Sequence, residues 1–199
     1  MELKISKNKI ELDKKLNELD CFVLEFTSLL NKSNIEYAIV SGYVSILFGR
    51  NRASEDVDLI VKKYNFKKFD ALWDKINDKF ECVNSQDSRD AYDEYLLNGN
   101  AIRFSRKGMF IPNFEFKFPK NELDRWTTEY KTKVLLNKNK LYISPLELQI
   151  PFKIFLGGEK DIEDARYLYN LFKGKMDNEL FEGFIHRLGV NKAFDKFLK

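Results

Sequence analysis

The sequence predicts an α/β fold in which a layer of strands and helices is followed by a C-terminal helical region. Residues 35–79 follow the order strand, helix, strand, helix with short loops. Residues 113–118 alternate apolar and charged side chains, as a half-buried strand does. From residue 144 onward, apolar residues recur at helical spacing. We therefore expect an α/β core over residues 1–130, and a hairpin plus helical C-terminal domain over residues 131–199.

The N-terminal half is expected to alternate helices with strands. Apolar side chains at near-helical spacing predict a helix over residues 9–31. Gly49 is placed to end a short helix, because glycine adopts the left-handed conformation that follows a last helical turn. The remaining predicted elements of this half are a strand over 35–41, that short helix over 42–48, a strand over 56–61 and a helix over 66–79.

The second half begins irregularly and ends in helices. Residues 87–97 fit either a short helix or an exposed loop. Asn137-Lys138-Asn139 is expected at the turn of a hairpin, and Ser144-Pro145-Leu146-Glu147 has the residues of a capped helix start. The predicted elements are strands over 101–105 and 113–118, a hairpin over 131–143, and helices from 144, over 159–173, over 177–187 and over 190–198.

Composition narrows the class of protein. The chain of 199 residues is 44% hydrophobic, which supports a core, and its net charge of +3 does not by itself indicate a nucleic-acid partner. No apolar run approaches the roughly 18 residues of a membrane span, and we expect neither a membrane partner nor a secretory signal. Cys21 and Cys82 are isolated, which favours a reduced, cytoplasmic protein. The single histidine, His186, argues against a His-rich zinc site.

Two aspartates, Asp56 and Asp58, stand at the head of an otherwise apolar predicted strand. Residues i and i+2 of a strand project from one face, so the two carboxylates point together. Carboxylates this close repel one another unless a cation lies between them, and Mg²⁺ with oxygen ligands meets that need. The pair therefore predicts a metal site, against the plainer interpretation of two solvated acids at a strand start.

The turn Ser41-Gly42 lies between the preceding strand and a short helix. The N–H groups that open a helix have no partner within it and can receive a phosphate. Gly42 allows close approach of the backbone, and Ser41 adds a hydroxyl donor. Without the later aspartates, the same turn would be an ordinary strand-to-helix connection.

The order of strand, small-residue turn, short helix, loop and D-x-D strand resembles the polymerase-β-like nucleotidyltransferase superfamily. The stretch from Ile39-Val40-Ser41-Gly42 to Asp56-Val57-Asp58 looks most like small prokaryotic members related to abortive-infection and toxin–antitoxin systems. Lys153 and the run Lys160-Asp161-Ile162-Glu163-Asp164 resemble that family's helical lysine and its basic-Asp-x-x-Asp motif. The resemblance spans about residues 36–61 and 145–172.

The resemblance implies a nucleotidyltransferase-type mixed sheet flanked by helices. It implies one or two Mg²⁺ ions and a nucleoside triphosphate, ATP among the candidates, as substrate. Catalytic and metal-binding roles fall on Asp56, Asp58 and a third carboxylate from a later strand. Nucleotide binding falls on the turn, a loop arginine and two residues of the helical half: Ser41, Gly42, Arg52, Lys153 and Asp161.

The third carboxylate has to be found by position. Glu115 is our choice, because it lies on the alternating strand beside Lys117, although a solvent-facing strand has the same pattern. Asp90, Asp93 and Glu94 are weaker candidates. The turn also departs from the family pattern, which has Gly-Gly or Gly-Ser where this chain has Ser41-Gly42.

The sequence thus predicts an enzyme that moves a nucleoside monophosphate from a triphosphate to a hydroxyl acceptor. The acceptor is an RNA 3′ end, a protein or a small molecule, with tRNA or protein suggested by toxin-like relatives. The alternatives are a catalytically inactive binding module of the same fold, and a toxin–antitoxin component whose partner is a cognate antitoxin.

Overall fold

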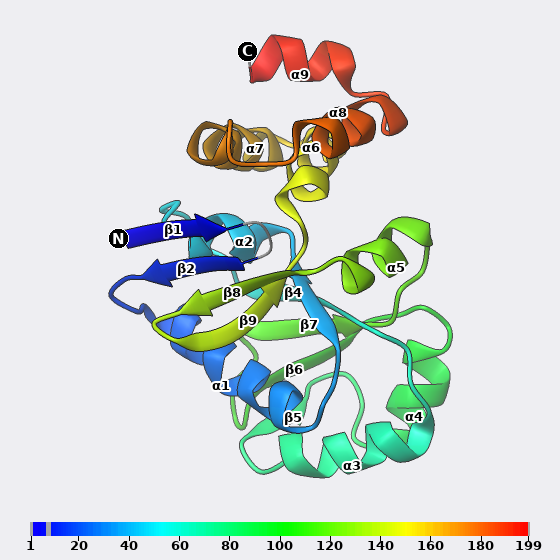
Figure 1. The fold of residues 1–199 in the computed structure, drawn as a ribbon. Helices are drawn as coiled ribbons and strands as arrows, with labels where there is room; N and C mark the ends of the chain where they lie inside the picture. Colours follow the sequence, from blue (N-terminus) through cyan, green and yellow to red (C-terminus); the bar gives the residue numbers. More distant parts are fainter. Residues whose placement is uncertain (1, 7–8, 199) are drawn as a thin grey trace.

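A mixed sheet organises the first three quarters of the chain in the computed structural model, which describes residues 2–6 and 9–198. Its strand order is β1-β2-β8-β9-β3-β4-β7-β6-β5 (Figure 1). The strands are β1 (Glu2–Ser6), β2 (Lys9–Asp13), β3 (Tyr37–Val40), β4 (Asp56–Val61), β5 (Phe80–Cys82), β6 (Ile102–Arg106), β7 (Asn113–Lys117), β8 (Thr132–Leu136) and β9 (Asn139–Ile143).

Helices cover the sheet and then continue beyond it. In Figure 1, α1 and α3 lie in the lower part of the molecule, α5 lies to the right of the sheet near β3 and β4, and α6 to α9 stand above it. The helices are α1 (Glu18–Lys32), α2 (Gly42–Leu47), α3 (Phe66–Ile76), α4 (Ser88–Asp90), the π-helical turn η1 (Ala91–Leu96), α5 (Glu122–Glu129), α6 (Leu146–Leu156), α7 (Glu159–Phe172), α8 (Asn178–Arg187) and α9 (Asn191–Phe197).

The sheet separates an aromatic core from a polar face. Val57, Leu59 and Val61 of β4 pack into the core, together with Phe114 and Phe116 of the neighbouring β7. Since side chains alternate along a strand, the other face of these strands carries the charged residues. The alternation predicted for residues 113–118 is therefore confirmed.

Rings from α1 fix the core against the sheet. The Phe114 ring stacks on Phe22 with 4.7 Å between centroids and on Phe26 with 4.3 Å. Phe26 also meets Phe80 of β5 edge-on at 5.1 Å, and all four rings are fully buried. This cluster places α1 and positions β7 beside β4.

The helix predicted over residues 9–31 is wrong for its first part. Residues 9–13 form β2, which pairs with β1 in antiparallel and with β8 in parallel orientation. Ile10 and Leu12 are both buried, a spacing of two that suits a strand. The helix begins only at Glu18, where Asn17 and Asp20 form a reciprocal capping box.

The predicted hairpin over residues 131–143 is confirmed as β8 and β9. Asn137 and Lys138 form its two-residue turn with φ of 46° and 69°, the left-handed pair that a tight hairpin needs. The hairpin lies inside the sheet, between β2 and β3. We therefore propose that any boundary between core and helical domain falls after β9 rather than at residue 130.

The helix start predicted at Ser144 is displaced by one residue. Ser144 follows the last residue of β9 and still bonds to β3, because its N–H donates to the Ile39 carbonyl at 2.8 Å. Pro145 takes the N-cap position, and no side chain caps α6. The helices predicted over 159–173, 177–187 and 190–198 are present as α7, α8 and α9.

The helical region packs against α2 and the residues that follow it. The Tyr167 hydroxyl of α7 donates to the Phe48 carbonyl at 2.9 Å, and the Phe48 ring meets Phe172 edge-on at 4.8 Å. Among the residues that the structure describes, no helix is both long and apolar enough to cross a membrane.

We expect Phe114→Ala to reduce the free energy of unfolding by about 3–5 kcal/mol, since it empties the centre of the ring cluster. Phe110→Ala is the matched control, because the Phe110 side chain is 77% exposed and its removal should change stability by less than about 0.5 kcal/mol. Urea unfolding followed by circular dichroism measures both. Equal losses would contradict this account of the core.

Candidate nucleotide site

The turn after β3 is held in an unusual backbone conformation. Ser41 has φ 61° and ψ −133°, a region that favours glycine. The Gln149 amide of α6 holds it from both sides, donating to the Ser41 carbonyl at 3.0 Å and accepting from the Ser41 N–H at 3.3 Å. A side chain from the helical region thus fixes the first residue of the turn.

A guanidinium lies directly over Gly42. A Cβ at this position would collide with the Nη2 atom of Arg52 and would come within 3.5 Å of the Ser54 hydroxyl. The Nε atom of Arg52 is buried and has no hydrogen-bond partner among the described residues. The turn therefore lies against a positive group that has one buried donor without a partner among the described residues.

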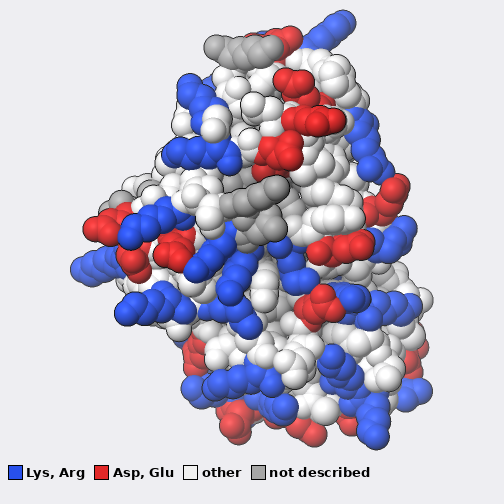
Figure 2. Space-filling model, in the orientation of Figure 1, with Lys and Arg blue, Asp and Glu red and all other residues white. Residues whose placement is uncertain are grey.

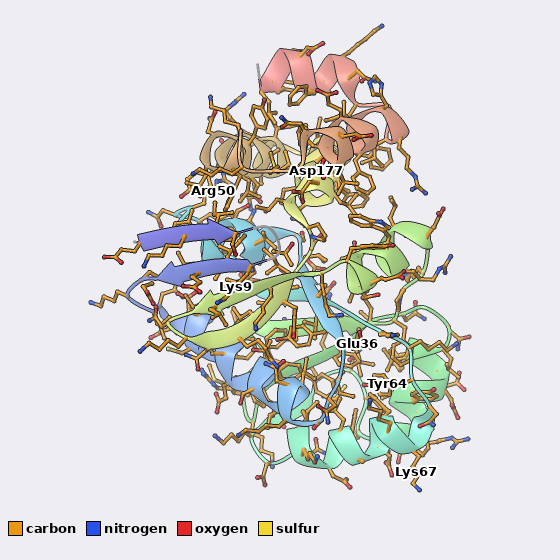
Figure 3. All side chains as sticks on the ribbon, viewed as in Figure 1. Lys9, Glu36, Arg50, Tyr64, Lys67 and Asp177 are labelled. Atoms are coloured by element: carbon orange, nitrogen blue, oxygen red, sulfur yellow. The ribbon has the colours of Figure 1, made fainter. Side chains whose placement is uncertain are left out.

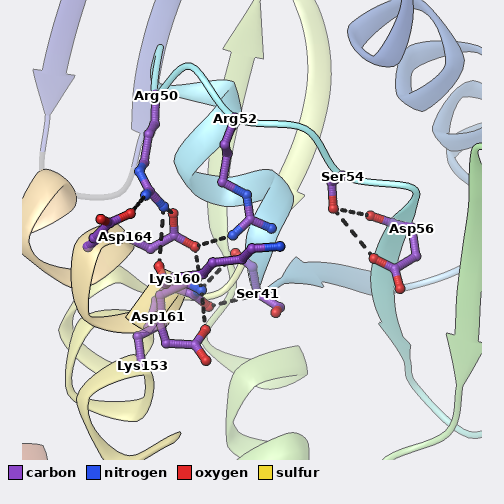
Figure 4. Close-up of polar contacts among 11 residues, drawn as sticks. Ser41, Arg50, Arg52, Ser54, Asp56, Lys153, Lys160, Asp161 and Asp164 are labelled. Carbon is purple, nitrogen blue, oxygen red and sulfur yellow. Dashed lines mark hydrogen bonds and ion pairs between the residues drawn. The ribbon is translucent and has the colours of Figure 1, made fainter. Parts of the chain in front are cut away.

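Asp164 of α7 holds that guanidinium in place. Its carboxylate is fully buried and contacts Arg52 at 3.0 Å, the Lys153 ammonium at 2.7 Å and the Arg50 guanidinium (Figure 4). Arg50 also pairs with Glu163 and donates to the Lys160 carbonyl at 3.2 Å. Three cations therefore share one buried carboxylate, and its removal would leave all three with less counter-charge.

Lys153 lies inside this cluster rather than at its surface. Its side chain is 1% exposed, and its ammonium bridges Asp161 at 3.0 Å and Asp164 at 2.7 Å. Asp161 is half-buried and lies against Gly158, at the start of α7. The two residues therefore connect α6 to α7 beneath the turn.

The acids of the sheet lie beside this cluster. Val40, the last residue of β3, pairs with Asp58 across the antiparallel β3–β4 register, so the Ser41-Gly42 turn emerges next to Asp58. In the parallel β4–β7 register, Asp58 lies opposite Glu115 and Asp56 opposite Asn113. Opposed residues project from the same face, so the three acids share the face away from the aromatic core.

Ser54 connects the two halves of the site. Its hydroxyl donates to the Asp56 carbonyl at 3.0 Å and lies 3.4 Å from the Asp56 carboxylate. Since the same hydroxyl lies against Gly42, the loop between Gly49 and Asp56 joins the turn to the acids. Asp56 itself is exposed, whereas Asp58 is half-buried.

Two cations of the chain already contact the acids. The Lys117 ammonium lies 3.2 Å from Asp58 Oδ1, and the Arg103 guanidinium lies 2.5 Å from Glu115. Burial raises the pKa of the Asp58 carboxyl above its usual value, and Glu115 and Asp56 raise it further, while Lys117 opposes them. The face therefore gathers negative charge that needs a counter-ion.

The donor chemistry of this face suits a hard divalent cation. Carboxylates of Asp56, Asp58 and Glu115 are oxygen ligands, and the Oδ1 atom of Asn113, opposite Asp56, is buried without a hydrogen-bond partner among the described residues. In the part of the chain that the structure describes, however, no three acidic, histidine or cysteine side chains converge as a metal centre requires. Asp58 and Glu115 are turned toward Lys117 and Arg103 instead.

Solved structures share this arrangement of elements. An antigenic nucleotidyltransferase-like protein from Paracoccidioides brasiliensis matches with a TM-score of 0.56 and 21% identity, over 91% of this chain and 92% of that one. The chain has a nucleotidyltransferase-type fold. The antibiotic-resistance factor ANT(2'')-Ia matches with a TM-score of 0.55 and 11% identity, over 88% of this chain and 94% of that one.

A further structure, ANT(2'')-Ia in complex with adenylyl-2''-tobramycin, matches this fold with a TM-score of 0.54 and 11% identity, over 84% of this chain and 97% of that one. No protein-family model and no curated protein matches the sequence. The nucleotidyltransferase-type fold is thus established by shape at low sequence identity.

The structure brings the residues singled out in the sequence into two adjoining clusters of the nucleotidyltransferase-type fold. One holds Ser41, Gly42, Arg52, Lys153 and Asp161, and the other holds Asp56, Asp58 and Glu115. Asp90 and Asp93 instead accept hydrogen bonds from Ser85 and Arg89, near α4. Asp164 belongs to the motif singled out in the sequence, but its ion pairs were not predicted. Sequence reasoning missed the contributions of Gln149, Lys117 and Arg103, because each contacts a residue of another element.

Replacing Asp164 with Asn should reduce the free energy of unfolding by about 3–5 kcal/mol, because three cations lose their shared buried counter-charge. Glu163→Gln is the control: it pairs with the same Arg50 but is 50% exposed, and its loss should cost at most about 1 kcal/mol. Urea unfolding compares the two variants. A smaller loss for Asp164→Asn than for Glu163→Gln would refute the shared-carboxylate interpretation.

Ser41→Gly should stabilise the protein by about 1 kcal/mol. Glycine relieves backbone strain of about 1–3 kcal/mol at φ 61°. It also costs about 0.5–1 kcal/mol, because an unfolded chain with glycine has more conformational entropy to lose on folding. Thermal unfolding measures the gain. Ser33→Gly, at φ −92°, is the comparison and should bring no gain, and a Ser41→Gly variant that melts lower than the parent would show that the turn is unstrained.

Proposed function

We propose that this protein is a Mg²⁺-dependent nucleotidyltransferase that moves a nucleoside monophosphate from a triphosphate to a hydroxyl acceptor. One observation supports this most directly: the register of β3, β4 and β7 gathers Asp56, Asp58 and Glu115 beside a glycine turn covered by Arg52. Acids that would hold a metal and a cationic turn that would hold phosphate are the two parts that the reaction needs.

Each cluster has a distinct part in the proposed reaction. Asp56 and Asp58, with Glu115, would hold the metal, which when bound neutralises phosphate charge and polarises the reacting oxygens. The Ser41-Gly42 turn and the Arg52 guanidinium would hold the triphosphate. Lys153 and Asp161 act on the nucleotide through the turn and Arg52, because the Lys153 ammonium is itself buried.

Positioning would carry most of the catalysis. With the triphosphate held over the turn and the acceptor hydroxyl beside the acids, the hydroxyl oxygen attacks the α-phosphorus and pyrophosphate leaves from the opposite side. The hydroxyl proton passes to a carboxylate of the same face.

The acceptor is proposed within three classes: an RNA 3′ end such as that of tRNA, a protein side chain, or a small molecule. ANT(2'')-Ia, solved with adenylyl-2''-tobramycin, supports the small-molecule class. The resemblance to toxin-type proteins supports tRNA or protein, together with a cognate antitoxin. On the face in Figure 2, basic and acidic side chains intermingle and neither sign covers the surface, in keeping with the net charge of +3.

A second candidate function is a binding module that has kept the fold without catalysis. The ion pairs Asp58–Lys117 and Glu115–Arg103 favour it, because they neutralise the acids without a metal. The two candidates differ in one outcome, which is whether label from the α-phosphate becomes covalently attached to an acceptor.

The test is incubation with each α-labelled nucleoside triphosphate and Mg²⁺, separately with cellular RNA, cellular protein and an aminoglycoside mixture. We expect transfer to one acceptor class and a loss of at least about 10³-fold in the Asp56→Asn/Asp58→Asn double variant, because removal of both carboxylates removes the metal. Asp74→Asn, an exposed acid on α3, should transfer label at the parental rate.

Two results decide against the enzyme. If the double variant transfers as much label as the parent, the transfer comes from a contaminating enzyme and not from this site. Absence of transfer in every arm, together with no rise in melting temperature on adding triphosphate and Mg²⁺, would favour the binding module without nucleotide.

A further inference from the structure

Lys117 lies beside the acids that we propose to hold a metal. It lies on β7, two residues after Glu115 and opposite Ile60, and its side chain reaches back to Asp58 Oδ1 at 3.2 Å. Both side chains are only partly exposed, Lys117 by 27% and Asp58 by 22%. The contact is therefore part of the site rather than a solvated surface pair.

The charges on this face explain why the lysine is there. Asp56, Asp58 and Glu115 bring three negative charges together, and the described residues that contact them supply two positive ones, Lys117 and Arg103. A half-buried carboxylate without a counter-charge is costly, so an internal cation stabilises the metal-free fold. The same cation must be lost from Asp58 before that carboxylate can serve a metal.

We propose that Lys117 is a built-in counter-ion that competes with the divalent metal for Asp58 and so lowers the metal affinity of the free protein. This inference rests on the proposed function, because it assumes that the acids hold a metal. It adds a residue that neither the D-x-D pattern nor the turn identifies. Release of the lysine from Asp58 then becomes a step in loading the site.

The side chain of Lys117 suits such an exchange. A lysine ammonium sits on a flexible four-carbon stem, so it can leave Asp58 by rotation within the side chain while β7 stays paired with β4. Its backbone position keeps the released ammonium at the same face, where a bound triphosphate would attract it. Nucleotide should therefore reduce the competition, and metal and triphosphate should load cooperatively.

The experiment measures Mn²⁺ binding to the full-length protein by calorimetry, without nucleotide and then with a non-hydrolysable triphosphate analogue. Lys117→Met, which removes the ammonium and keeps the stem, should bind Mn²⁺ about tenfold more tightly than the parent when nucleotide is absent. Lys117→Arg keeps the charge and should bind no more tightly than the parent. With the analogue present, the advantage of Lys117→Met should shrink to less than about threefold.

Controls separate this effect from general changes in charge or folding. Lys67→Met removes an exposed charge from α3, outside the acidic face, and should leave Mn²⁺ affinity unchanged (Figure 3). Without metal, Lys117→Met should melt below the parent, and Mn²⁺ should raise its melting temperature by more than it raises that of the parent. Lys117→Gln, neutral but polar, replaces Lys117→Met if that variant does not fold.

Metal binding tests this inference, whereas nucleotide transfer tests the proposed function. A folded Lys117→Met or Lys117→Gln variant that binds Mn²⁺ no more tightly than the parent overturns the inference. Failure of the parent and both variants to bind Mn²⁺ overturns it as well. Tighter binding in the variant, abolished by adding Asp58→Asn, supports the inference even if no nucleotide is ever transferred, and in that case only the proposed reaction fails.

Discussion

The buried carboxylate of Asp164 is the interaction on which the rest of the site depends. It contacts Arg50, Arg52 and Lys153 at once, and these residues come from the loop after α2 and from α6. Cations at this depth would be unfavourable without it, and the carboxylate would be equally unfavourable without them. One contact therefore fixes the loop, sets the guanidinium over Gly42 and attaches α7 to the sheet.

The register of β4 and β7 is a second constraint. It lowers the stability of the fold, whereas the Asp164 contacts raise it. The aromatic core holds β4 and β7 in register, and that register places Glu115 opposite Asp58 whatever their mutual repulsion. Lys117 and Arg103 lessen the cost without removing it. A fold that keeps three acids on one face at this expense has the charge distribution expected of a functional site rather than of a packing surface.

Local patterns in the sequence predicted the parts of this site that local geometry determines. The alternation of Asp56 with Val57, and of Glu115 with Phe114, fixes which face each residue takes. Residues 9–13 were wrongly predicted as helix. Ile10 and Leu12 fit both a helical and a strand pattern, and the strand forms by pairing with β8, more than a hundred residues later. The contacts of Gln149, Asp164 and Lys117 were not predicted for the same reason, since their partners are remote in the chain and no rule of local spacing identifies them.

These contacts between distant parts of the chain make the helical region part of the candidate site. Gln149 holds the strained Ser41, and Asp164 positions Arg52. The ion pair of Lys153 with Asp161 connects α6 to α7 beneath the turn. All four lie within residues 149–164, whereas the groups they position lie within residues 41–52. The sheet alone would present its acids, but it would leave Ser41 in an unsupported conformation and Arg52 without a counter-charge. The helices therefore complete the half of the site that we propose for phosphate, and the sheet supplies the half that we propose for metal.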